Sequence, residues 1–305
     1  MAEYLIIDSH VHTYQTREIG LQAKQGGGVT DFGGTVEELL PVLQRAGASQ
    51  AVMVNMLPLA EMKNAAVAKL PADLAGEERD RALAEIDAKM LGRLERRNAW
   101  TCDVAAENPS LIPFINLDPL QDEATMTAEV TDKVENRGAR GIKLHPSSQQ
   151  FYPGDRRLWP GYGLAQEMGL PVVFHSGTFA SAEQYARPKH FVDVLASFPD
   201  LTVVMAHIGQ GFLDEARSLA ADYPNLQFDC SAIISNTAAD GAFTDKDLTA
   251  LIRDVGVERV MFGSDFPWYD PADSAERLLR LDFSDEEKRL LLAQNAIRIY
   301  SLDEA

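Results

Sequence analysis

The chain has 305 residues, of which 46% are hydrophobic and 24% charged, and its formal net charge is −18. This is the composition of a soluble globular protein, and the acidic excess repels nucleic-acid backbones and anionic membranes, so neither is an expected partner. No apolar run reaches about 18 residues, and the first residues lack the basic region and cleavage site of a signal peptide, so we expect a cytoplasmic protein.

Eight short apolar runs alternate with helical segments along the chain. The runs are continuously apolar, as strands covered on both faces are. We predict strands at residues 4–9, 50–56, 111–117, 139–145, 171–176, 201–207, 225–231 and 259–263. Helical periodicity with recognisable ends predicts helices at residues 35–46, 188–198, 211–221 and 245–255, and closing helices within residues 284–300.

This alternation predicts an α/β fold, a (β/α)8 TIM barrel that forms a single domain over residues 1–305. A doubly wound open sheet is the alternative, but the first strand-to-helix turn lacks the G-x-G-x-x-G sequence. Two connections are too long for a minimal barrel: residues 13–34 after the first strand and residues 57–80 after the second. Because loops that follow strands lie at the C-terminal mouth of a barrel, we expect both to cover the site.

The first strand ends in alternating polar residues, Asp8, His10 and His12. Side chains two residues apart on a strand point to the same face, so the carboxylate and the two imidazoles share a face. Two imidazoles about 6–7 Å apart along a strand can bind one cation without distortion of the main chain. Taken alone, the pair is equally compatible with hydrogen-bonded histidines at a strand end.

Polar residues recur at the ends of later predicted strands. Five of the six histidines lie at strand ends, and only His190 lies elsewhere. A barrel would gather these side chains at one mouth, where barrel enzymes place their catalytic groups. The set consists of His10, His12, Lys143, His145, His175, His207 and Asp265.

These motifs resemble the amidohydrolase superfamily, and most closely its amidohydrolase-related branch of metal-dependent hydrolases and decarboxylases. The resemblance rests on Asp8-x-His10-x-His12 and on residues 141–146, 173–175, 206–209 and 263–267, and it extends from Ile6 to Asn295. It implies a (β/α)8 barrel and a divalent cation, commonly zinc. By matching positions, it implies that His207 is the acid/base or substrate-polarising residue and that the metal ligands are His10, His12, His175 and Asp265.

Three imidazoles and one carboxylate leave a coordination position open for water, as in catalytic metal sites. A cation there lowers the pKa of bound water toward about 7 and polarises a carbonyl group. Asp265 would accept the proton of this water, and His207 would stabilise the oxyanion or protonate the leaving group. We therefore predict a metal-dependent hydrolase of an amide, ester or lactone. The alternative, which the resemblance also implies, is a non-oxidative metal-dependent decarboxylase of an aromatic or muconate-like carboxylic acid.

Lys143, the third predicted catalytic residue, has two functional interpretations and a structural one, in which it pairs with a barrel carboxylate such as Asp8 or Asp229. Its free ammonium could anchor a substrate carboxylate, with His145 beside it in the same role, and this is the preferred interpretation. By resemblance, it could instead be carbamylated and add a second metal site together with His175 and His207.

Two aromatic or basic residues in the loops complete the predicted substrate contacts. Trp268 could stack on a substrate ring, and Arg17 could meet an anionic group. We expect a small-molecule substrate and, by the resemblance, a homodimer or a larger homo-oligomer.

Overall fold

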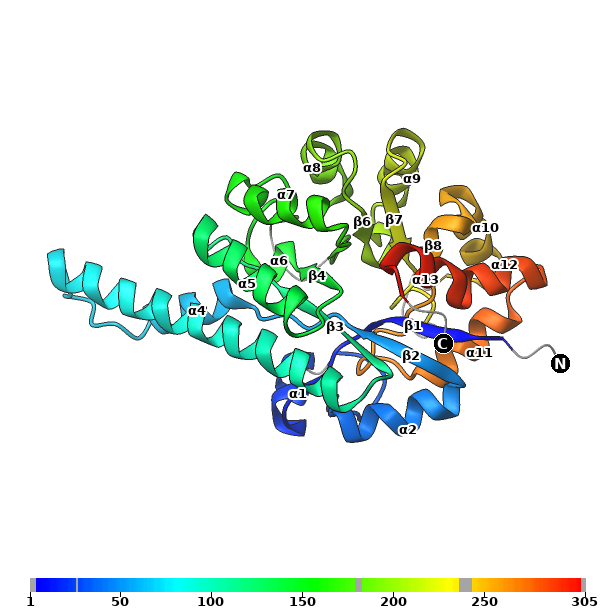
Figure 1. Ribbon diagram of the computed structural model, residues 1–305, viewed down its shortest axis with the longest axis horizontal. Helices are drawn as coiled ribbons and strands as arrows, with labels where there is room; N and C mark the ends of the chain where they lie inside the picture. Colours follow the sequence, from blue (N-terminus) through cyan, green and yellow to red (C-terminus); the bar gives the residue numbers. More distant parts are fainter. Residues whose placement is uncertain (1–3, 26, 179–182, 236–242, 303–305) are drawn as a thin grey trace.

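The computed structural model describes residues 4–25, 27–178, 183–235 and 243–302. Its strands pair in parallel in the order β1 to β8, with helices outside them (Figure 1). The predicted (β/α)8 TIM barrel is confirmed, and each of the eight predicted strands is present. The strands are β1 (Ile6–Val11), β2 (Ala48–Met53), β3 (Leu111–Asn116), β4 (Gly141–Leu144), β5 (Val172–Phe174), β6 (Val203–Met205), β7 (Leu226–Asp229) and β8 (Val260–Met261).

Main-chain hydrogen bonds between β1 and the segment of β8 bring the two ends of the sheet together. The Ser9 N–H donates to the Phe262 carbonyl over 2.9 Å, and the Asp265 N–H donates to the His10 carbonyl over 2.9 Å. The residues after β8 are therefore fixed directly beside the residues that end β1. This closure places Asp265 next to His10 and His12, although Asp265 lies 253 positions after His12 in the sequence.

The predicted helices are also present. Thr35 begins α2 with a capping box that includes Glu38, as its sequence indicates. In the described part of the chain, no helix is long and apolar enough to cross a membrane. The α-helices are α1 (Arg17–Lys24), α2 (Val36–Ala46), α3 (Leu59–Val67), α4 (Gly76–Glu107), α5 (Glu123–Glu135), α6 (Pro146–Gln149), α7 (Trp159–Met168), α8 (Val192–Ser197), α9 (Leu213–Asp222), α10 (Asp245–Val255), α11 (Pro271–Arg280), α12 (Asp285–Arg289) and α13 (Asn295–Tyr300). Shorter helical turns are η1 (Arg156–Leu158), η2 (Pro188–Phe191), η3 (Ala206–Gly209), η4 (Val257–Arg259) and η5 (Leu290–Gln294).

The two long connections after β1 and β2 are confirmed, and each contains a helix. The first contains α1 and packs against the loop after β8, where the Val29 N–H donates to the Trp268 carbonyl over 2.9 Å. The second contains α3, after which α4 runs for 32 residues and projects beyond the barrel (Figure 1). Asn64 of α3 donates to the Gln150 side chain over 3.3 Å, so α3 lies beside α6, the short helix that follows β4.

Gly141 opens β4 because the Phe114 ring of β3 occupies the space beside it. A Cβ atom at residue 141 would lie 2.7 Å from Cδ2 of Phe114 and closer still to Cε2. The ring cannot move freely, because it packs edge-to-face on Tyr300 with the centroids 4.9 Å apart. Only glycine fits this close approach of a ring to the main chain.

Replacing Gly141 with alanine is expected to lower the free energy of unfolding by about 1–3 kcal/mol, because the added methyl group overpacks the barrel interior. Urea unfolding measures this loss. Gly163→Ala in α7 is the matched control, since the nearest atom to a Cβ there is 4.0 Å away and alanine is the better helix former. An unchanged free energy of unfolding for Gly141→Ala would contradict this account.

Candidate metal centre

Three ligand atoms converge where β1 ends and β8 is followed by its loop. Nε2 of His10 lies 3.3 Å from Nε2 of His12, and Asp265 Oδ1 lies 3.7 Å and 3.5 Å from these two nitrogens. A triangle of this size has its centre about 2 Å from each corner, which is the bond length from nitrogen or oxygen to a first-row divalent cation. Among the described histidine, cysteine and acidic residues, these three form the group that could hold a metal ion.

His10 is held in the orientation that a metal ligand needs. Its Nδ1–H donates to Oδ2 of the buried Asp229 over 2.8 Å, which leaves the lone pair of Nε2 facing the cluster. Burial, followed by the nearby Lys143 ammonium, lowers the pKa of His10 to about 3. The ring is therefore neutral at pH 7, as metal ligation requires.

The second oxygen of Asp229 organises the His207 side of the site. Asp229 Oδ1 accepts the His207 N–H over 3.1 Å and the Ser231 N–H over 3.0 Å, and it also accepts the Ser231 hydroxyl. Nδ1 of His207 lies 3.0 Å from the Ser231 carbonyl oxygen and 2.9 Å from its Oγ. A carbonyl oxygen only accepts, so Nδ1 carries a proton and Nε2 of the neutral ring does not.

His207 and Asp265 have the left-handed backbone that most residues avoid. Their φ angles are 62° and 66°, although neither is glycine. Outside helix caps such as Gln25 and Ser301, conformations of this kind cluster at functional sites. Burial alone would raise the pKa of Asp265, but the hydrogen bond from His12 and the adjacent imidazoles outweigh it and hold that pKa below its usual range.

Asp8 precedes the two histidines on β1 and has a structural role. Its Oδ1 accepts the N–H groups of His10 over 3.2 Å and of Ser264 over 2.9 Å, so it ties β1 to the segment after β8. Burial raises the pKa of Asp8 to about 7.

Lys143 lies beside the cluster and is buried. Its Nζ is 3.3 Å from Nε2 of His10. Burial lowers the pKa of Lys143 to about 8, and Asp229 and Asp265 oppose this shift, so the group is still largely cationic at pH 7. Lys143 is therefore a cation beside His10, and its role as an anchor for a substrate carboxylate stays a prediction.

The other two strand-end histidines form a stack next to this group. The rings of His145 and His175 are parallel, with centroids 4.0 Å apart, and His175 lies 5.0 Å from the His207 ring. His175 is not one of the three residues whose ligand atoms converge, and its role as a fourth ligand stays a prediction. Burial holds the pKa of His145 well below its usual value, which favours a neutral ring, and its role as a substrate contact stays a prediction.

The two predicted loop contacts have different positions. The Trp268 ring lies edge-on to His12 with the centroids 5.4 Å apart, so it borders the cluster. Arg17 is on the exposed surface, where it donates to Glu38 and to the Asp31 carbonyl. Its predicted contact with a substrate anion stays a prediction, and the carboxylate of Glu38 already neutralises its charge.

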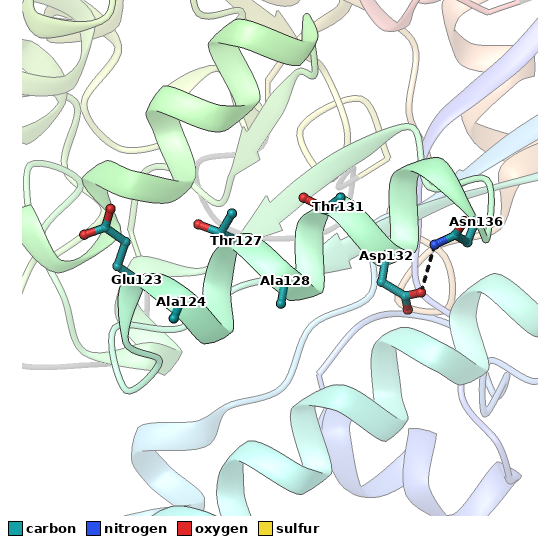
Figure 2. A pocket seen from close by; sticks show the side chains of 7 residues that line it. All are labelled: Glu123, Ala124, Thr127, Ala128, Thr131, Asp132 and Asn136. Carbon is teal, nitrogen blue, oxygen red and sulfur yellow. Dashed lines mark hydrogen bonds between the residues drawn. The ribbon is translucent and has the colours of Figure 1, made fainter.

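A surface hollow lies along one side of α5, and none of its lining residues belongs to the cluster of His10, His12 and Asp265 (Figure 2). Its only drawn hydrogen bond joins Asn136 Nδ2 to Asp132 Oδ1 over 3.3 Å. No imidazole or cationic side chain lines it, so it lacks the groups that the strand ends gather. The lining residues are Glu123, Ala124, Thr127, Ala128, Thr131, Asp132 and Asn136.

The fold and this cluster define a (β/α)8 barrel protein with candidate metal ligands at the carboxyl ends of its strands. The family model for amidohydrolases matches residues 7–302. The protein belongs to the amidohydrolase family, which confirms the resemblance found in its sequence.

Several proteins similar to this chain are decarboxylases. A gamma-resorcylate decarboxylase from a Rhizobium species is 20% identical in an alignment of 258 positions that covers 69% of this chain and 76% of that protein. A dihydroxybenzoic acid decarboxylase from a Polaromonas species, solved with bound manganese and the inhibitor 2-nitroresorcinol, is 13% identical, with a TM-score of 0.71 and coverage of 100% of this chain and 98% of that chain. The 5-carboxyvanillate decarboxylase from Sphingomonas paucimobilis is 15% identical, with a TM-score of 0.67 and coverage of 98% and 100%. At these identities, the structural likeness establishes the fold.

Proposed function

We propose that this protein is a metal-dependent decarboxylase of an aromatic carboxylic acid. The observation that carries the proposal is the buried Lys143 ammonium, 3.3 Å from His10 Nε2, because a cation beside a metal site suits a substrate with a carboxylate. The names of the similar proteins support the same reaction. They favour the alternative of the sequence analysis over the hydrolase that was its first prediction.

The residues present fit a divalent metal ion. His10, His12 and Asp265 would hold it, with His175 as the proposed fourth ligand. A donor set of nitrogen and oxygen accepts manganese as well as the zinc that the sequence analysis expected, and manganese is bound in the Polaromonas structure. When bound, the ion would supply a positive charge that binds substrate oxygens and stabilises negative charge on the substrate.

The roles of the other residues follow from the electron balance of the reaction. Decarboxylation breaks the bond between the ring carbon and the carboxylate carbon, and the electron pair stays on the ring carbon, which must receive a proton. Lys143 would hold the substrate's anionic oxygens by charge and hydrogen bonds. His207 would deliver the proton from Nε2 when its ring is protonated, because Ser231 keeps the Nδ1 proton in place.

Trp268 would form one wall for the substrate ring, since its side chain borders His12. The neutral rings of His145 and His175 would contribute hydrogen-bonding or stacking surface. A ring-shaped acid is therefore a better match for these side chains than a peptide-like amide.

A panel of acids and lactones tests the proposal directly. Purified protein with Mn²⁺ or Zn²⁺ is expected to release carbon dioxide from hydroxybenzoates such as 2,6-dihydroxybenzoate, and Asp265→Asn is expected to release none. Hydrolysis of lactones or esters without carbon dioxide release from any acid would instead support the hydrolase, for which Asp265 would act as the base on bound water.

A further inference from the structure

One side of α4 meets the carboxyl ends of three strands with polar side chains. Arg97, Asn98 and Thr101 lie on adjacent turns, and their exposed fractions are 9%, 1% and 1%. Buried polar groups destabilise a fold unless they form hydrogen bonds, so such a surface on a long helix requires specific partners. Those partners are at the ends of β1, β2 and β3.

Toward β1, the partner is the residue that follows His12. The Arg97 guanidinium donates to the Thr13 carbonyl oxygen. Asn55, just after β2, accepts the Thr13 N–H over 2.7 Å and donates to Thr13 Oγ1 over 2.9 Å. Asn55 also donates to Thr101 Oγ1 of α4 over 3.1 Å. Every polar group of Thr13 is therefore held by Asn55 or by α4.

The charge of Arg97 is balanced in an unusual way. Within the described residues, its guanidinium has no carboxylate partner, and the rings of Tyr14 and Trp100 flank it with centroids 5.4 Å and 4.7 Å away. These rings and the Thr13 carbonyl stabilise the cation where it lies. Burying a charged guanidinium costs desolvation free energy. The presence of a buried arginine here therefore indicates that its contact to Thr13 has a positional role.

Toward β3, Asn98 pairs with the main chain of Asn116 in both directions. Asn98 Nδ2 donates to the Asn116 carbonyl over 2.9 Å, and the Asn116 N–H donates to Asn98 Oδ1 over 2.8 Å. The Asn116 side chain then donates to the Lys143 carbonyl over 2.7 Å. The helix is thus linked to the main chain of Lys143 through a single residue.

We propose that Arg97 and Asn98 are positioning residues of this site. They touch neither the ligand atoms nor the substrate position, but they fix the main chain next to His12 and, through Asn116, next to Lys143. Because displacements near 1 Å can reduce the rate of an enzyme by about 100-fold, these contacts set the geometry on which the proposed function depends. This inference rests on the proposed metal site and adds α4 to it.

Arg97→Met tests the contact to Thr13, because methionine keeps the length of the side chain and removes the donor. Metal-stripped protein is titrated with Mn²⁺ in a calorimeter, and the dissociation constant is expected to rise about 10-fold, at the lower end of the range for residues that support ligands. Arg96→Met, an exposed change on the same helix, is expected to bind Mn²⁺ as the wild type does. Arg97→Lys keeps the charge and one donor, so it is expected to recover part of the loss.

A lowered Tm with unchanged Mn²⁺ affinity in both Arg97 variants would overturn the inference, because a merely structural contact behaves in that way. If Arg97→Met does not fold, Arg97→Lys and Asn98→Ala carry the test. Failure of the wild type to bind Mn²⁺ or Zn²⁺ would instead refute the proposed metal site itself.

Asn98→Ala tests the contact to Asn116. The KM for the aromatic acid is expected to rise about 10-fold, because Lys143 is displaced. Asn108→Ala is the matched control, since Asn108 follows the last residue of the same helix, its side chain donates to the Val104 carbonyl over 2.8 Å, and its main chain meets β3 at Leu111, the amino end of that strand. Equal KM values for Asn98→Ala and the wild type would overturn this part of the inference.

Discussion

Replacing His10 with alanine is expected to abolish metal binding and activity together. The substitution removes Nε2, one of the three converging ligand atoms, and leaves the buried carboxylate of Asp229 without its imidazole partner. A divalent cation held by two donors and solvent binds far more weakly than one held by a full protein ligand set. Elemental analysis of protein purified without chelator measures the metal content per chain.

His190→Ala is the control for this experiment, because His190 packs on Tyr152 on the outer surface and the substitution is expected to change neither metal content nor activity. About one metal ion per wild-type chain, lost in His10→Ala, would support the site of His10, His12 and Asp265. About two ions would support the second site with Lys143, His175 and His207. Full metal content in folded His10→Ala would refute the ligand assignment.

Replacing Asp229 with asparagine is expected to weaken metal binding by about 10- to 100-fold, the usual effect of losing a carboxylate that orients a ligating histidine. If the amide nitrogen faces His10, Nδ1 of His10 must accept, and the ring proton moves to Nε2, where it blocks ligation. If the amide nitrogen faces Ser231 and His207, their N–H groups meet a donor instead of an acceptor. Either orientation disturbs one of the two histidines.

The Mn²⁺ dissociation constant of Asp229→Asn measures this effect, and carbon dioxide release is expected to fall with it. Asp118→Asn is the matched control, because Asp118 is a buried carboxylate after β3 that bonds to Gln149 and to the Leu120 N–H. If both Asp229→Asn and Asp118→Asn bind Mn²⁺ with the affinity of the wild type, the tautomer of His10 does not depend on the carboxylate of Asp229.

The strands of this fold could be predicted because buried parallel strands are written as continuous apolar runs. Val172–Phe174 and Val203–Met205 are examples, and both lie within their predicted segments. The helix Leu59–Val67 could not be predicted, because Pro58 precedes it without a side-chain cap and its apolar residues do not form a strong stripe. The start of α4 at Gly76 also lacks a capping side chain.

The candidate site could be predicted in part for a similar reason. His10 and His12 alternate on one strand, so their convergence follows from strand geometry alone, while Asp265 required the barrel to bring it to them. No motif in the sequence singles out Asp229, since it is one of 46 acidic residues and its contact to His10 spans 219 positions. The feature of the sequence that points to Asp229 is its position at the end of β7, where a polar residue interrupts an apolar run.

The sequence of α4 contains no comparable feature that identifies its buried polar residues. Arg97 and Asn98 lie within a helix whose sequence is charged along much of its length, so nothing in the pattern separates the buried pair from exposed neighbours such as Arg96. Their role depends on which strand ends the helix crosses. That is a property of tertiary packing, and a single sequence does not encode it locally.

The backbone at His207 and Asp265 has a consequence for any effort to make this protein more heat-resistant. Left-handed conformations at residues other than glycine cost on the order of 1–3 kcal/mol each, although histidine and aspartate tolerate them better than most. Glycine at either position would relieve that strain, so a screen for thermostable variants would select the changes that remove the proposed proton donor or a proposed metal ligand. Resistance to heat and turnover of substrate are therefore opposed at these two residues, and selection for the first alone would eliminate the second.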